Sequence, residues 1–378
     1  MTFRIKPIAP IVFCMAAAAS AQAGPTVSDA STFATGGPGE SQPDSITIAD
    51  GSVWVEYGNG ADSTGKSGNS TIVQYSTTGA VQHTYTVSGL VDGLKLNPVT
   101  GMIWALQNND GNATLSFINT KTMSVSAPLS YMSPPYVYGP NSAHGYDDVA
   151  FLNGKVYMSY TNPANPTDPV LQILNNGNSP TGTLTTTTIL TAQQTGLTST
   201  TNEPDIDSLK STPDGKLVLT TEGDGPGCCD PVGEFTLISH PGMTNQTETN
   251  VHVTSAGQNV QGIDDVIFPG AKSGWLYVAE TGTANKVERV FLSGLDPNTP
   301  IVAIGGLNEV ALVNVTTGDV ESPLLTGLSS PHGMAFVAAA SSAPEPATWP
   351  MLILGLGGLA VAAGRRKSGA VSRLATAN

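Results

Sequence analysis

The sequence has few basic residues and almost no cysteine. It contains 15 lysines and arginines against 29 aspartates and glutamates, and three cysteines in 378 residues. Six of the basic residues lie near the two ends, so residues 24–345 hold nine basic residues and all 29 acidic ones, a net charge near −20. Such a surface repels phosphate backbones, which excludes nucleic acid as a partner. We interpret it as the solvated acidic coat of an extracellular protein.

Several catalytic signatures are also missing: the sequence has no GxSxG, HExxH or paired CxxC pattern. One string, Gly60 to Ser67, does fit the phosphate-binding pattern GxxxxGK[ST]. That chemistry requires a helix directly after the string, whose N-terminus holds the phosphate. Here Gly68-Asn69-Ser70 leads into a predicted strand, so we interpret the string as a loop.

The N-terminus has the features of a secretory signal peptide over residues 1–23. Arg4 and Lys6 precede an apolar run from Ile8 to about Ala19, and Ala21-Gln22-Ala23 has the small-x-small pattern of a cleavage site. We predict export by the Sec translocon and cleavage by signal peptidase after Ala23. Cys14 leaves with this peptide. Cys228 and Cys229 remain, either as a vicinal disulfide, as free thiols or paired with another chain.

The C-terminus contains three ordered features. Pro344-Glu345-Pro346 is followed by an apolar segment from Ala347 to Gly364, and then by Arg365, Arg366 and Lys367. The apolar segment is just long enough for a transmembrane helix, and the basic cluster favours a cytoplasmic end. Residues 368–378 would form a short cytoplasmic tail.

This order resembles the PEP-CTERM sorting signal over residues 344–367. The resemblance implies processing by an exosortase-type protease, an intermediate tethered to the inner membrane, and then a cell-surface or secreted product. It also implies an extracellular matrix with exopolysaccharide as a partner. The tail is longer than this signal leads us to expect, so a plain membrane anchor remains an alternative.

The body between the two ends has an all-β composition and a repeat. Few Lys or Glu, many Gly, Thr, Ser, Asn and Val, and no long helical period indicate strands joined by turns. Five segments show a strand, a turn glycine and a second strand, which predicts a hairpin each time. They begin at Asp44, Asp92, Asp147, Asp207 and Asp264, with turn glycines Gly51, Gly101, Gly154, Gly215 and Gly274. A sixth strand starts at His332.

Repeats of about four strands predict a β-propeller over residues 44–337, of six blades within a range of five to seven. The repeats resemble those of NHL, SMP-30 and lactonase-like propellers. An array of β-sandwiches is the alternative fold. Residues 24–43 and 338–343 are expected to be flexible linkers. Trp54, Trp104 and Trp275 fall in second strands, where we expect them to pack between blades.

First strands line the channel of a propeller, so the repeat starts predict a ring around it. Carboxylates that converge there repel one another unless they bind a proton or a cation, and oxygen ligands suit Ca²⁺ or Mg²⁺. The candidate metal ligands are Asp92, Asp147, Asp207, Asp264 and His332, with Asp44 in the same ring and Asp148, Asp205 and Asp265 beside it. The alternative is that each Asp caps a turn or binds the backbone of the next blade.

These features favour a non-enzymatic binding or scaffold protein of the cell surface or extracellular matrix. The rival hypothesis is a metal-dependent propeller hydrolase, a lactonase or a phosphoesterase, with a Ca²⁺-type cation held by the acidic ring. No catalytic residue is assigned from the sequence, although His332 is the best candidate for a base.

Overall fold

The computed structural model describes residues 24–132, 137–138, 142–143, 145–163, 165–196, 206–223 and 232–339. The predicted signal peptide, the sorting segment, the tail, Asp205, Cys228 and Cys229 lie outside the described residues. Within the described ranges, no helix is long and apolar enough to cross a membrane.

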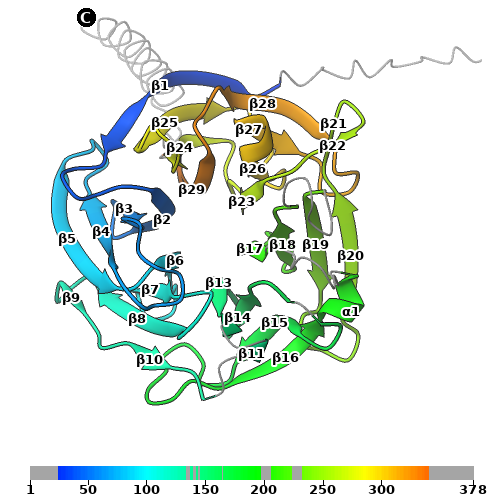
Figure 1. The fold of residues 1–378 in the computed structure, drawn as a ribbon. Helices are drawn as coiled ribbons and strands as arrows, with labels where there is room; N and C mark the ends of the chain where they lie inside the picture. Colours follow the sequence, from blue (N-terminus) through cyan, green and yellow to red (C-terminus); the bar gives the residue numbers. More distant parts are fainter. Residues whose placement is uncertain are drawn as a thin grey trace, which may run out of the picture. The chain divides into compact units, whose positions relative to one another are not determined.

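Six antiparallel sheets surround a central channel (Figure 1). Their innermost strands contact one another in a closed ring, which makes the body a six-bladed β-propeller and rules out the sandwich array. In ring order these strands are β2 (Pro43–Ala49), β6 (Val91–Leu96), β13 (Tyr146–Leu152), β17 (Ile206–Ser211), β23 (Ile263–Ile267) and β29 (Pro331–Ala338).

The first four blades follow the chain from the channel outward. Blade one adds β3 (Ser52–Tyr57), β4 (Asn69–Tyr75) and β5 (Val81–Ser88), and blade two adds β7 (Met102–Gln107), β8 (Thr114–Asn119), β9 (Ser124–Val125) and β10 (Leu129–Ser130). Blade three adds β14 (Lys155–Tyr160), β15 (Pro169–Leu174) and β16 (Thr186–Thr191), and the short α1 (Ala192–Thr195) follows it. Blade four adds β18 (Leu217–Thr221), β19 (Glu234–Ser239) and β20 (Thr247–His252).

Short two-stranded sheets lie outside the blades: β11 (Val137–Tyr138) with β12 (Ser142–Ala143), and β21 (Thr254–Ser255) with β22 (Gln258–Asn259). In blades one to four the predicted hairpin joins the first two strands. Its turn glycine has a positive φ of 72°, 71°, 77° and 82° at Gly51, Gly101, Gly154 and Gly215, a backbone conformation that favours glycine. These four hairpin predictions are confirmed.

Blades five and six are interleaved, and the fifth predicted hairpin is wrong. β23 pairs with β26 (Ile301–Ile304), and β27 (Glu309–Val313) and β28 (Val320–Thr326) complete blade five. The intervening β24 (Ser273–Glu280) and β25 (Lys286–Ser293) belong to blade six, outside β29. Gly274 is therefore not a turn residue. A Cβ there would lie 2.2 Å from the Val337 carbonyl oxygen, so this glycine permits close approach of β29 to β24.

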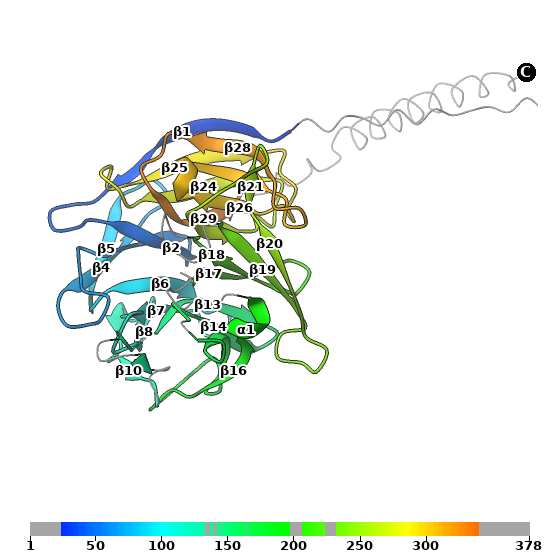
Figure 2. The ribbon, with the colours of Figure 1, turned by 45° about the vertical axis from the view of Figure 1, so that its right-hand side comes forward.

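The predicted linker over residues 24–43 contains a strand, which corrects that expectation. β1 (Thr26–Thr35) pairs with β25 and forms the outer strand of blade six (Figure 2). Its first seven residues are exposed and largely polar, which is why its composition resembles a linker. Phe33 anchors its end, packing edge-on against Tyr277 and Tyr75 at ring-centroid distances of 4.8 and 5.7 Å.

Apolar side chains fill the spaces between neighbouring blades. Trp54 of blade one packs with Leu94 and Ile103 of blade two, and Trp104 packs with Tyr146 and Val149 of blade three. Trp54 and Trp104 are buried, as predicted. Trp275 is only partly buried, and the Arg289 guanidinium lies 4.5 Å from its ring centroid. The core thus holds each inner strand in a fixed place around the channel.

Replacing Phe33 by Ala should destabilise the propeller by about 3 kcal/mol, because this buried ring holds β1 against blade six. Val27→Ala is the control on the same strand: Val27 is 41% exposed, so its truncation should cost below about 0.5 kcal/mol. Chemical denaturation of the purified protein measures both. Equal losses in the two variants would contradict an anchoring role for Phe33.

Candidate functional site

A β-bulge near the start of each inner strand builds the site. The ladder shifts between residues 43 and 46, 91 and 93, 146 and 149, 206 and 209, and 263 and 266, and a sixth shift lies opposite Pro331 and Met334. Bulges re-aim side chains and are common beside active sites. Each of these six shifts encloses one of the residues predicted for the channel ring.

One cavity of about 460 Å³ opens at this end of the channel, which we call the mouth. All six predicted ring residues line it: Asp44, Asp92, Asp147, Asp207, Asp264 and His332. Gly60, Ala61 and Ser63 of the phosphate-loop-like string also line the mouth. That string connects two strands, β3 and β4, with no helix after it, as the sequence predicts.

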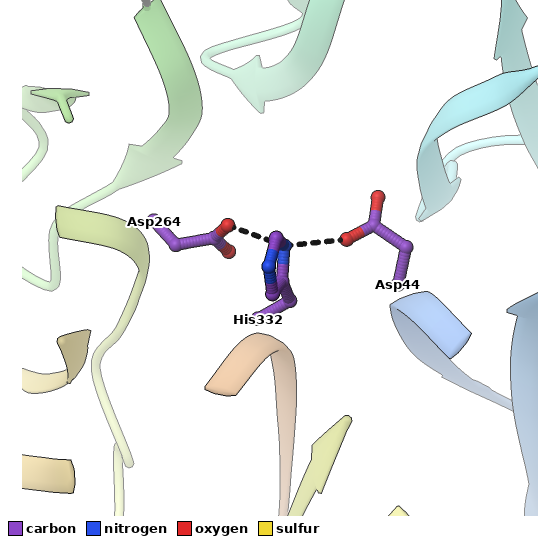
Figure 3. A group of neighbouring side chains, drawn as sticks. All are labelled: Asp44, Asp264 and His332. Carbon is purple, nitrogen blue, oxygen red and sulfur yellow. Dashed lines mark ion pairs between the residues drawn. The ribbon is translucent and has the colours of Figure 1, made fainter. Parts of the chain in front are cut away.

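His332 lies between two carboxylates at the mouth (Figure 3). Its Nδ1 is 2.6 Å from Asp264 Oδ2 and 3.0 Å from Asp44 Oδ1. Burial alone would lower the pKa of His332, but the charges of Asp264 and then Asp44 outweigh it and raise that pKa to about 12. The imidazole is therefore cationic at neutral pH and neutralises part of the ring.

The other ring nitrogen of His332 faces a hydroxyl. Ser330 Oγ lies 3.1 Å from Nε2, so hydroxyl, imidazole and carboxylate stand in the order of a hydrolase triad. Ser330 also has a positive φ of 53°, a strained conformation for a serine. The sequence analysis missed this residue because Ser330 precedes the repeat start and matches no nucleophile motif.

A second group contains oxygen ligands alone. One carboxylate oxygen each from Asp207, Glu222 and Asp264 lies within 4.8 Å of the others, a spacing that a cation can bridge. Asp44, Asp264 and His332 form another such group, which shares Asp264 with the first. Asp92 and Asp147 line the cavity but belong to neither group. Glu222 was missed because it follows β18 instead of opening a repeat.

The second residue of two bulges has a structural role. Asp148 of blade three accepts hydrogen bonds from the backbone N–H of Val149 and of Leu209 in blade four, at 2.8 and 3.0 Å. Asp265 of blade five accepts from the N–H of Met334 in blade six at 2.7 Å. For these two residues the alternative interpretation holds, because they bind the backbone of the next blade.

Two lysines form ion pairs with these two aspartates. Lys95 and Lys210 each place Nζ 3.0 Å from Asp148 Oδ2, and Lys210 lies 2.6 Å from Asp265 Oδ1. Burial alone would raise the pKa of Asp148, but the two ammonium groups lower it. The sequence did contain a signal for the lysines, since each stands three residues after a ring aspartate, in DGLK and DSLK.

A buried acid stands behind the ring in blade one. Glu56 is fully buried, and burial, followed by the nearby charge of Asp44, raises its pKa well above the ordinary value. This shift favours the protonated form of the Glu56 carboxyl. The sequence did not indicate this buried acid, because the residues around Glu56 have the pattern of an ordinary second strand of a blade.

Comparisons with known proteins bear on the two parts of the chain separately. No curated protein sequence matches it. The periplasmic gluconolactonase of Pseudomonas aeruginosa is a similar solved structure, with 11% identity, a TM-score of 0.43, and coverage of 79% of this chain and 89% of that one. The luciferin-regenerating enzyme has 12% identity and a TM-score of 0.39, with coverage of 68% and 78%.

Hydrazine synthase of Kuenenia stuttgartiensis has 10% identity and a TM-score of 0.39, with 72% of this chain covered. The chain spans 64% of the length of that protein. Residues 342–367 match the PEP-CTERM protein-sorting motif, the signal that the sequence resembles there. The chain thus joins a six-bladed β-propeller to a PEP-CTERM motif, which identifies an exported protein that is anchored transiently at the membrane.

Proposed function

We propose that this protein is a non-enzymatic binding protein of the cell surface or extracellular matrix, and that the channel mouth binds a divalent cation of the Ca²⁺ type. The observation that carries the proposal is the group of Asp207, Glu222 and Asp264 oxygens within 4.8 Å of one another. Oxygen ligands alone favour Ca²⁺ over zinc, and a cation would relieve the repulsion among the carboxylates.

A cation at the mouth also offers a means of binding matrix carbohydrate. Bound Ca²⁺ commonly keeps coordination positions for water or for ligand oxygens, and six to eight oxygens are usual. Three carboxylates leave several of these positions for a polyhydroxylated or acidic polysaccharide. We therefore assign exopolysaccharide as the ligand class, in agreement with export through the sorting motif.

Hydrolysis is the second candidate, favoured by the order Ser330, His332, Asp264. A triad base must accept the serine proton at Nε2, which requires a neutral imidazole. Here two carboxylates contact Nδ1 and stabilise the imidazolium instead. We therefore place binding ahead of hydrolysis.

Metal analysis tests the cation site. Purified protein equilibrated with Ca²⁺ and then desalted should retain about one ion per chain. Asp207→Asn and Asp264→Asn should each reduce the content at least about tenfold, because each removes a charged ligand. Asp214→Asn is the control, since this exposed aspartate lies in the β17–β18 turn at the other end of the channel. Equal metal content in all four folded proteins would refute the site.

Removing the metal should also lower thermal stability. A ligand that binds only the folded state stabilises it, by about 2.7 kcal/mol at a hundredfold excess over Kd. Chelator should therefore lower the melting temperature of the wild type and of Asp214→Asn, and leave that of Asp207→Asn unchanged. A melting temperature that does not respond to chelator in the wild type would contradict a cation bound to the folded protein.

Three variants, assayed on lactone, ester and phosphoester substrates, distinguish a hydrolase from a non-enzymatic binding protein. We expect no turnover in the wild type. Turnover that Ser330→Ala and His332→Gln both abolish, at unchanged metal content, would establish the triad and overturn the non-enzymatic proposal. Turnover lost only in Asp207→Asn would instead establish a metal-dependent hydrolase.

A further inference from the structure

The two channel lysines share one carboxylate oxygen. Lys95 and Lys210 each place Nζ 3.0 Å from Asp148 Oδ2, so the two nitrogens lie at most 6.0 Å apart. The same oxygen also accepts the backbone N–H of Leu209 at 3.0 Å. Three N–H donors therefore compete for one acceptor atom, and two positive charges lie close together in a shielded place.

The two ammonium groups differ in how many partners they have. An ammonium has three N–H donors. Those of Lys210 face Asp148 Oδ2 at 3.0 Å, Asp265 Oδ1 at 2.6 Å and Ser208 Oγ at 2.8 Å. Among the described residues, Asp148 is the one group that pairs with Lys95. Loss of a proton would therefore break fewer interactions at Lys95 than at Lys210.

The surroundings of Lys95 also favour its neutral form. The Lys95 side chain is 22% exposed. Burial lowers its pKa, Asp148 of β13 opposes this, and the charge of Lys210 of β17 lowers the pKa further. Asp265 of β23 also opposes, and the resulting pKa is about 8. For Lys210, by contrast, the charges of Asp148 and Asp265 outweigh burial and raise the pKa.

Lys95 lines the mouth cavity of about 460 Å³, a size within the usual range for small-molecule sites. The carboxylates around this cavity accept hydrogen bonds from hydroxyl groups and repel anions. The mouth therefore favours a neutral polyhydroxylated compound over a keto acid or a sugar phosphate. A shielded amine next to a second cation is an arrangement that makes lysine a nucleophile toward carbonyl groups.

We propose that Lys95 captures a polyhydroxylated aldehyde, such as the open-chain end of a sugar, as an imine in the mouth. The Lys95 nitrogen bonds to the carbonyl carbon, and one nitrogen proton passes to the carbonyl oxygen. The C–O bond then breaks, and the hydroxyl leaves as water with the second nitrogen proton while the C=N bond forms. Nothing is oxidised or reduced. The step needs no metal, so its failure would leave the proposed cation site untouched.

Reductive trapping tests this capture. The purified full chain is incubated with glyceraldehyde and cyanoborohydride, which reduces an imine to a stable amine, and mass spectrometry of its peptides follows each lysine separately. At pH 7.5 we expect Lys95 to be modified at least about tenfold faster than the exposed Lys121, because an exposed lysine ordinarily has a pKa near 10.4. A rate at Lys95 no higher than that at Lys121 would overturn the proposal.

The pH profile distinguishes a nucleophilic amine from one that is merely accessible. The rate at Lys95 should level off above about pH 8, whereas that at Lys121 should still rise toward about pH 10. This measurement needs no variant, so it does not depend on how a substitution affects folding. Profiles of the same shape at both lysines would contradict the proposal.

A matched pair of variants tests the role of the second ammonium. Lys210→Met removes the neighbouring charge and leaves Asp148 to Lys95, so the rate at Lys95 should fall at least about threefold at pH 7.5. Lys216→Met is the control, because Lys216 pairs with the turn residue Asp214, and it should leave that rate unchanged. An undiminished rate at Lys95 in folded Lys210→Met would refute the activation of Lys95 by its neighbour.

Discussion

Closure of the ring is the constraint on which the rest of the structure depends. A channel lined by like charges opens unless neighbouring blades hold the inner strands together. Blade six supplies the closure from three distant parts of the chain: β29 inside, β24 and β25 in the middle, and β1 outside. Because β24 and β25 lie between β23 and β26 in the chain, two strands of blade six interrupt the sequence of blade five.

In two of the bulges, adjacent aspartates have different structural roles. The first residue of a bulge faces the mouth, as Asp147 and Asp264 do, and the second can bind the next blade, as Asp148 and Asp265 do. Like charges thus stand side by side in sequence yet have different surroundings. Asp148 contacts two lysines and accepts hydrogen bonds from two backbone N–H groups, whereas Asp264 pairs with the His332 imidazole. One local backbone irregularity therefore gives two adjacent aspartates different partners.

The sequence predicted what is local and repeated. Four hairpins, the six-bladed count and the ring of first-strand residues all follow from short patterns that recur along the chain. The interleaving of blades five and six did not follow, because strand pairing over tens of residues leaves no local mark. β1 was missed because an outer strand with seven exposed residues needs no apolar alternation. Glu222 and Ser330 were missed because each reaches the mouth from a connection, where the repeat imposes no pattern.

Asp264 belongs to both groups of possible metal ligands at the mouth. Its carboxylate pairs with the His332 imidazole and also belongs to the group with Asp207 and Glu222. A cation in that group would compete with His332 for Asp264 and leave Asp44, at 3.0 Å, as the remaining carboxylate partner of the imidazole. Without a metal, the positive charge of the imidazolium therefore offsets part of the carboxylate charge that a bound cation would offset. This explains why one histidine interrupts a ring of aspartates: a sixth carboxylate would add repulsion, whereas His332 offsets it from within the ring.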